Sequence, residues 1–259
     1  VFNSADITML GLMKGNYAVG IYSTAAKIEK ILNQLIASIV YVLMPRLSYM
    51  FDIEDYDNIN ILLRKVLAVI VTIGFPCCAG AAVMAKEIVL IVGGENYVGA
   101  TLVLRILLLS TFFSLVGGSF LGNIVLLPSG NEKKFMVICC ISTVINIIAN
   151  AILIPVFGVY AAAATTAFSS LIILILLLFS VDKSIKITKI PQLFIAPFIG
   201  SFIMVICCYY LKKMFASLIM RTGVCVILGI IVYMCIQIIL KNELLEEIIG
   251  KIIKKFKKG

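Results

Sequence analysis

Long apolar runs recur along the chain, and they constrain its fold more than any other feature. Residues 171–179, for example, read LIILILLLF and lack the alternation of a strand in a membrane barrel. A helix crosses the bilayer core, about 30 Å thick, with about 20 apolar residues. We therefore predict one partial and seven complete helical spans, over residues 1–13, 17–44, 62–85, 100–127, 135–155, 159–181, 192–211 and 222–240. The predicted fold class is all-α integral membrane, a bundle of about eight transmembrane helices.

The composition supports this prediction and excludes several classes of protein. Of the 259 residues, 62% are hydrophobic and 14% are charged, whereas soluble domains have about 45–50% and about 25%. A soluble enzyme, a disordered chain and a disulfide-rich secreted domain are therefore excluded. Histidine is absent, and the eight cysteines lie inside apolar runs, where they suit buried packing. No metal site and no cofactor is predicted.

The basic residues predict an orientation in the membrane. The chain carries 22 Lys and Arg against 13 Asp and Glu, and most of the positive charges lie in short connections between spans. With alternating spans, fourteen fall on the side of the 45–65 loop and the C-terminus, and five on the other side. The positive-inside rule then places the C-terminus in the cytoplasm. Residues 241–259 form a basic amphipathic tail that we expect to bind anionic headgroups, and no nucleic-acid partner is expected.

The predicted span at residues 17–44 carries a polar stripe. Six polar side chains on it follow helical spacing and fall within roughly 80° of arc. They are Ser23, Lys27, Lys30, Gln34, Ser38 and Tyr41. An ionised side chain at a helix centre costs about 2.5–3.5 kcal/mol, so a cationic stripe suggests a lumen that attracts anions. The alternative is that Lys27 and Lys30 snorkel to headgroups, although Gln34 and Ser38 extend the stripe beyond that reach.

Three further ionisable side chains lie within the predicted spans. Asp6 is a candidate proton-binding or cation-binding carboxylate, and a structural ion pair with a lysine of the next helix is an equal alternative. Glu29 points away from the polar stripe. Arg105, a turn and a half into its span, either adds a third cation to the anion site or snorkels outward. Asn146 and Asn150 share one helix face, and we expect them to hydrogen-bond a neighbouring helix.

From Asp6 onward, several separated motifs resemble the second half of bacterial polysaccharide exporters. These are the flippases of lipid-linked oligosaccharides such as O-antigen units, within the multidrug/oligosaccharidyl-lipid/polysaccharide exporter superfamily. The matching stretches are DITMLG at 6–11, VGIY at 19–22, PRLS at 45–48, GENY at 94–97 and VINIIANAILIP at 144–155. The resemblance covers about residues 3–181. It departs from the family at Tyr160, where a glycine is usual.

The resemblance implies a transporter rather than an enzyme, in the bacterial inner membrane. Residues 1–181 would be the second lobe of a two-lobed exporter, 182–240 two additional C-terminal helices, and 241–259 a cytoplasmic tail. The implied partners are membrane lipids, an N-terminal lobe and a glycan on undecaprenyl pyrophosphate, moved by alternating access. Four side chains would bind this substrate, namely Lys27, Lys30, Gln34 and Arg105. Asp6 and Glu29 are the candidates for ion coupling.

Three other functions stay open. A multidrug or cation-coupled exporter of the same superfamily would favour acidic cavity residues, for which Asp6 and Glu29 are candidates. A membrane-embedded enzyme such as a glycan polymerase would need a positioned base or paired acids, and the predicted spans carry neither. An inactive truncated lobe, or a lobe that serves only as an assembly partner, would follow if the gene encodes no first lobe.

Overall fold

The computed structural model describes residues 2–247, and that part of the chain is helical and contains no strand. α1 (Phe2–Lys14) and α2 (Asn16–Tyr41) form a hairpin at Gly15, whose φ of 81° is a conformation that glycine adopts without strain. α2 ends shortly before Pro45, which lacks the N–H that would continue the helix. α3 (Met44–Asp52) then leaves at an angle of 47° to α2.

The middle of the chain forms two long helices joined by a short connection. α4 (Tyr56–Val83) begins at Asp55, whose side chain caps it by accepting the Asn58 N–H at 3.3 Å. α5 (Ala85–Gly93) and η1 (Glu95–Tyr97) connect it to α6 (Ala100–Ser114). α6 continues into η2 (Leu115–Leu126), which has π-helical hydrogen bonding. At Gly117 of η2 the helix comes close to α8, because a Cβ there would lie 3.0 Å from the Leu174 Cα.

The remaining helices form two hairpins. α7 (Glu132–Phe157) and α8 (Val159–Ser180) turn at Gly158, and α9 (Ile190–Met214) and α10 (Leu218–Ile239) turn at residues 215–217. In the loop between α8 and α9, the N–H and the hydroxyl of Ser184 both donate to Asp182. These hydrogen bonds hold the pKa of the Asp182 carboxyl below its usual range.

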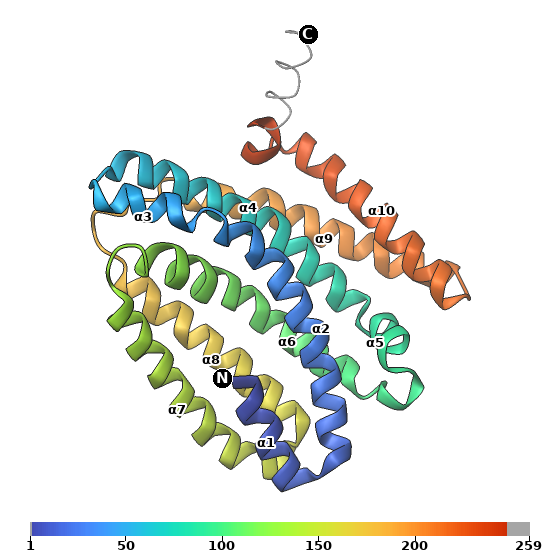
Figure 1. Ribbon diagram of the computed structural model, residues 1–259. Helices are drawn as coiled ribbons and strands as arrows, with labels where there is room; N and C mark the ends of the chain where they lie inside the picture. Colours follow the sequence, from blue (N-terminus) through green and yellow to red (C-terminus); the bar gives the residue numbers. More distant parts are fainter. Residues whose placement is uncertain (1, 248–259) are drawn as a thin grey trace.

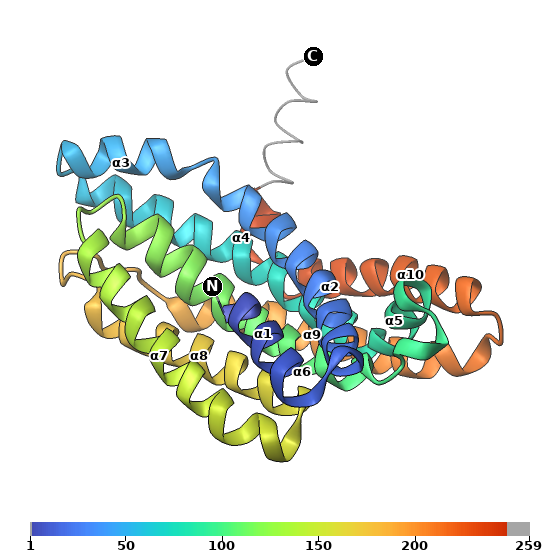
Figure 2. The same ribbon diagram turned by 60° about the horizontal axis from the view of Figure 1, so that its bottom comes forward.

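The long helices pack in a continuous order, α7 on α8, α8 on α6, α6 on α4, α4 on α9 and α9 on α10. α1 lies against α7 and α2, and α2 lies against α6. Figure 1 and Figure 2 accordingly show α7 and α8 on one side of the molecule and α9 and α10 on the other. The α9–α10 hairpin is therefore attached to the rest of the bundle mainly through α4.

The predicted spans agree with the helices. Within residues 2–247, six helices are long and apolar enough to cross a membrane, namely α4, α6 with η2, α7, α8, α9 and α10. α2 becomes a seventh when it is joined to α3. α1, with 13 residues, corresponds to the predicted partial span. The all-α membrane fold predicted from the sequence is confirmed.

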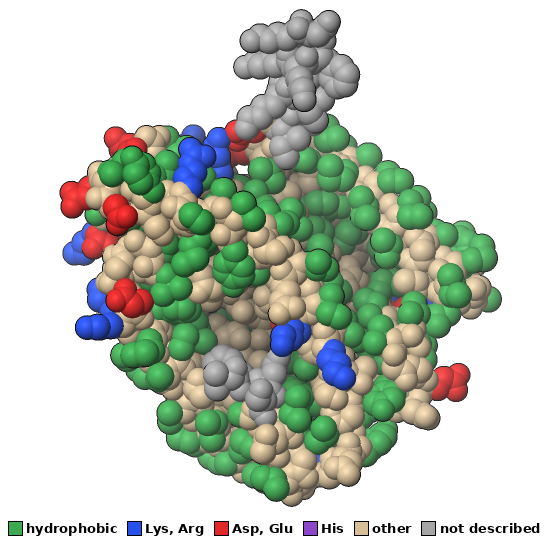
Figure 3. Space-filling view, in the orientation of Figure 1, with side chains coloured by type: hydrophobic (Ala, Val, Ile, Leu, Met, Phe, Trp, Pro, Cys, Tyr) green, Lys and Arg blue, Asp and Glu red, His purple; other side chains and the backbone are tan. Residues whose placement is uncertain are grey.

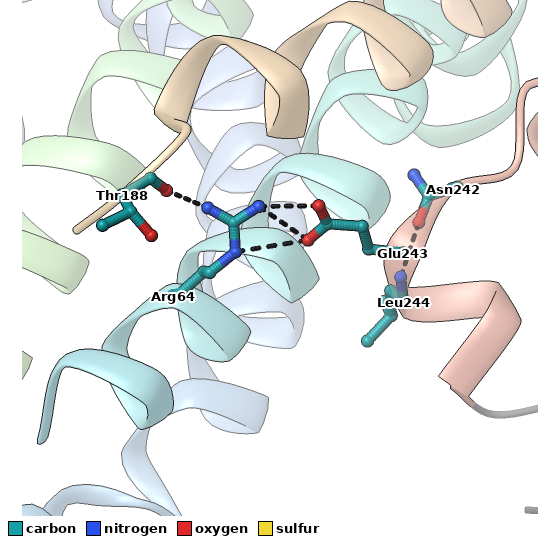
Figure 4. A network of polar contacts seen from close by, with 5 residues as sticks. All are labelled: Arg64, Thr188, Asn242, Glu243 and Leu244. Carbon is teal, nitrogen blue, oxygen red and sulfur yellow. Dashed lines mark hydrogen bonds and ion pairs between the residues drawn. The ribbon is translucent and has the colours of Figure 1, made fainter. Parts of the chain in front are cut away.

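A polar contact ties the segment after α10 to the start of α4. Arg64 of α4 donates to both carboxylate oxygens of Glu243, each at 2.7 Å, and to the backbone carbonyl of Thr188 (Figure 4). Lys65 pairs with Glu247 at 2.7 Å. The Asn242 side chain accepts the Leu244 N–H at 3.0 Å and so caps the turn that carries Glu243. Of the predicted tail at 241–259, residues 248–259 lie outside the described residues.

Candidate functional site

The polar stripe of α2 lies on the open face of the described structure. Lys27, Lys30, Gln34, Ser38 and Tyr41 are all exposed. Tyr41 accepts a hydrogen bond from Asn123 of η2 at 3.0 Å, and within residues 2–247 no ion pair involves either lysine of the stripe. In Figure 3, isolated basic side chains interrupt a mainly hydrophobic surface over α2. The stripe therefore presents positive charge to whatever covers this face.

An apolar stripe runs beside the polar one on the same helix. It consists of Ile31, Leu35 and Ile39, which are 59%, 62% and 44% exposed. At 100° per residue these side chains are centred about 90° from the polar stripe. The exposed face of α2 is thus divided lengthwise into a polar half and an apolar half. Such a division suits a helix at the boundary between an aqueous space and an apolar surface.

Glu29 lies on the other side of α2, as the sequence predicts. Its carboxylate is buried between α2 and α6, where it accepts the Thr111 hydroxyl at 2.9 Å and the Asn33 amide at 3.3 Å. Neither donor is charged. Glu29 thus points into the interface between α2 and α6, whereas Lys27 and Lys30 lie on the exposed face.

Asp6 is fully buried at the centre of a second polar cluster. Its carboxylate accepts hydrogen bonds from Tyr22 of α2 at 2.5 Å, Asn150 of α7 at 2.6 Å and Thr166 of α8 at 2.6 Å. All three donors are neutral, and among the described ion pairs none joins Asp6 to Lys27. Among the described contacts, Asp6 thus has three neutral donors from three helices and not the lysine partner that the sequence left as an alternative.

The cluster around Asp6 extends along α7 and α8. Asn150 also donates to the Asn146 side chain at 3.2 Å and accepts the Thr165 hydroxyl at 2.5 Å. The Asn146 side-chain nitrogen is buried and, in the described structure, has no hydrogen-bond partner. The Asp6 carboxylate is therefore buried without a charged partner among the described ion pairs, and neutral hydrogen-bond donors satisfy it instead.

The sequence pattern reveals only part of this cluster. Asp6 stands out because a carboxylate is rare in a membrane helix, and the pair Asn146 and Asn150 is visible as two amides one turn apart. Hydrogen bonding to neighbouring helices is confirmed for Asn150, which contacts Asp6 and Thr165. Among the described contacts, the Asn146 side chain bonds only to Asn150 of its own helix. Tyr22 and Thr166 are missed, because both residue types are common in apolar helices and nothing in their spacing relates them to residue 6.

Arg105 lies apart from the polar stripe. It is exposed on α6 and donates to the Ala82 carbonyl of α4 at 3.0 Å. It also lines a cavity between α4, α6 and α9, to which no described residue of α2 contributes. The structure therefore brings Lys27, Lys30 and Gln34 together on one face and places Arg105 elsewhere.

Comparison with known proteins supports the resemblance read from the sequence. Residues 1–102 match a family model described as "Polysaccharide biosynthesis protein". No curated protein matches the chain at a significant level. Among solved structures, one titled "Lipid II flippase MurJ, inward closed conformation" matches with a TM-score of 0.75 and 19% sequence identity. That match covers 94% of this chain and 51% of the other, so the chain spans about half the length of that flippase.

These matches agree with the sequence on two points. The predicted resemblance to proteins of polysaccharide export agrees with the family model for polysaccharide biosynthesis proteins over residues 1–102. The fold resembles that of the matched structure, and the described helices are those of a multi-pass helical membrane protein.

Proposed function

We propose that this chain is one lobe of a transporter that flips a lipid-linked oligosaccharide across the cytoplasmic membrane for polysaccharide biosynthesis. The family model at residues 1–102 and the flippase fold support the reaction class. The observation that carries the assignment is the exposed cationic stripe on α2. The chain spans about half the length of the flippase that it matches, and the stripe lies on an exposed face of the chain. An opposing lobe would complete a passage against it.

The chemistry of the stripe suits the proposed substrate. An undecaprenyl pyrophosphate is an anion attached to a long apolar chain. Attraction between unit charges at 4 Å rises from about 1 kcal/mol in water to about 4 kcal/mol at an effective dielectric constant of 20. Lys27 and Lys30 would supply this attraction, and the Gln34 amide would add a hydrogen-bond donor. Arg105 falls outside this set because it borders a different surface.

We assign ion coupling to Asp6, with Glu29 as a second candidate. Asp6 has the burial and the neutral oxygen-rich surroundings that favour exchange of a proton or a monovalent cation. Because α1, α2, α7 and α8 all meet at or beside Asp6, its occupancy would alter how these helices pack against one another. A buried carboxylate such as that of Asp6 also favours a cation-coupled drug exporter as the alternative function.

The test of the proposal is glycan export by variants of the full-length protein. Lys27→Ala combined with Lys30→Ala should abolish export while leaving membrane insertion intact. The matched control is Lys133→Ala with Lys134→Ala, which removes two exposed lysines at the start of α7 and should leave export unchanged. Normal export by the Lys27 and Lys30 double variant would remove the anion-binding assignment. Efflux of cationic drugs without glycan export would favour the alternative function.

We further propose the inner membrane as the location, with three units at residues 1–181, 182–240 and 241–259 and a cytoplasmic C-terminus. The excess of positive charge on the side of the C-terminus supports this orientation. An alkaline phosphatase fused at Gly259 should be inactive, because that enzyme needs an oxidising compartment. High activity of the fusion would contradict the orientation.

A further inference from the structure

Two cations meet at the end of α4, outside the sites discussed so far. Arg105 of α6 donates to the carbonyl of Ala82 at 3.0 Å, and Lys212 of α9 donates to that of Val83 at 3.1 Å. These carbonyls belong to the last turn of α4, where the helix offers no further N–H groups to donate to them and its dipole is negative. Because Ala82 and Val83 are consecutive, both cations are held at one place.

The two cations border an open cavity with an apolar wall. The cavity has a volume of about 380 Å³ and lies between α4, α6 and α9. Ala82, Val83 and Val205 supply apolar lining, and Tyr209 lies beside the basic end. None of the described lining residues is acidic. The site therefore combines positive charge with a hydrocarbon surface.

The cations keep donors for a further partner. A guanidinium carries five N–H donors and an ammonium three, and each cation uses one of them on α4 among the described contacts. Lys213 adds a third positive charge close by, with its ammonium 4.5 Å from the centre of the Tyr209 ring. The nearby carboxylate of Glu87 is already paired with Arg221 at 3.5 Å. The local charge is therefore positive and complementary to a phosphate.

We propose that this cavity binds one acidic glycerophospholipid. The phosphate is held by Arg105 and Lys212, and an acyl chain lies along Ala82, Val83 and Val205. A lipid fits better than a free anion, because a soluble phosphate would leave the apolar part of the lining without a partner, whereas an acyl chain would cover it. In the proposed orientation, the site faces the outer leaflet. It does not depend on the transport function, because it shares no residue with the polar stripe or with the Asp6 cluster.

The absence of tryptophan from the chain gives a direct test. Tyr209→Trp places a single fluorophore at the site, and the probes are phosphatidylglycerol and phosphatidylcholine with brominated acyl chains, which quench tryptophan on contact. At equal mole fraction, phosphatidylglycerol should quench Tyr209→Trp more strongly. Phe168→Trp, exposed in the middle of α8 and far in sequence from any charge, should be quenched equally by both lipids.

Charge variants in the Tyr209→Trp background locate the preference. Arg105→Gln with Lys212→Gln should weaken apparent binding of phosphatidylglycerol about tenfold, the loss expected when a charge-assisted hydrogen bond is removed. Lys133→Gln with Lys134→Gln removes the same charge from exposed positions at the start of α7 and should keep the preference. Val205→Trp, in a chain that retains Tyr209, fills the acyl groove without touching either cation and should lower the binding of phosphatidylglycerol.

Three results would overturn the proposal. Equal quenching of Tyr209→Trp by both lipids would show that no acidic lipid is preferred there. A preference that survives Arg105→Gln with Lys212→Gln would assign it to other residues. Removal of the preference by millimolar inorganic phosphate would show a site for a free anion instead of a lipid. Size-exclusion chromatography and far-ultraviolet circular dichroism of each variant establish that the fold is retained.

Discussion

Replacing Asp6 by alanine should strongly destabilise the protein, because three buried donors lose their acceptor together. Tyr22, Asn150 and Thr166 all donate to this one carboxylate at 2.5 to 2.6 Å. A buried donor left without a partner costs about 1–3 kcal/mol. With three such donors, of which the hydroxyls can turn to other acceptors, we expect a loss of about 3 kcal/mol or more.

Asp6→Asn distinguishes hydrogen bonding from charge. The amide oxygen can still accept from Asn150, and the hydroxyls of Tyr22 and Thr166 can accept from the new amide nitrogen. The expected loss is therefore about 1 kcal/mol, smaller than that of the alanine variant. Ion coupling requires the carboxylate, so Asp6→Asn should nevertheless stop transport. This combination of a mild effect on stability and a complete loss of transport separates the two roles of the residue.

Thermal unfolding in detergent, followed by circular dichroism, measures the effect. For a chain of this size about 1 kcal/mol corresponds to a Tm shift of about 2–4 °C, so Asp6→Ala should lower Tm by at least about 6 °C. Asp52→Ala, which removes an exposed carboxylate at the end of α3, should change Tm by less than about 2 °C. A Tm for Asp6→Ala within 2 °C of that of the parent protein would refute the central position of this carboxylate.

Two further predictions concern packing and the C-terminal contact. Gly117→Ala should destabilise by about 1–3 kcal/mol, because its Cβ would meet the backbone of Leu174 at 3.0 Å. The control is Gly223→Ala, whose Cβ would meet nothing within 4 Å and which should be neutral or stabilise the protein by up to about 1 kcal/mol. Equal Tm values for the two variants would contradict the close packing of η2 on α8. Glu243→Gln should cost about 1 kcal/mol, since Glu243 is half exposed, and should speed tryptic cleavage after Lys241. The control is Glu246→Gln, at an exposed position without an ion pair among the described contacts, which should be cleaved at the parental rate. The same cleavage rate for both variants would show that the contact between Arg64 and Glu243 does not hold this segment on α4.

The fold could be predicted from the sequence because bilayer thickness and hydrophobicity fix most of it. Each long helix begins and ends within six residues of its predicted span, and α6 with η2 at 100–126 agrees most closely, against the expected 100–127. The bend between α2 and α3 was less predictable. The span at 17–44 is apolar through the break, and only Pro45 indicates where the helix cannot continue. The π-helical geometry of η2 leaves no pattern in the sequence beyond its glycines.

The site could be predicted where one helix suffices to define it. The stripe from Lys27 to Ser38 and the opposite direction of Glu29 follow from helical spacing alone. The partners of Asp6 come from three other helices, and spacing along one helix says nothing about contacts between helices. Arg105 illustrates the same limit, because its position beside Lys212 depends on how α6 and α9 both pack on α4.

The claim on which the transport proposal rests is that the polar half of α2 faces water inside the membrane. In a variant lacking the eight native cysteines, single cysteines at Lys30, Gln34 and Leu35 can be exposed to a membrane-impermeant, hydrophilic thiol reagent. Lys30→Cys and Gln34→Cys should react rapidly, and an anionic reagent should outpace a cationic one at Gln34→Cys, where Lys27 and Lys30 remain. Leu35→Cys, on the adjoining apolar stripe, should react slowly. Equal protection of all three positions would contradict the aqueous passage.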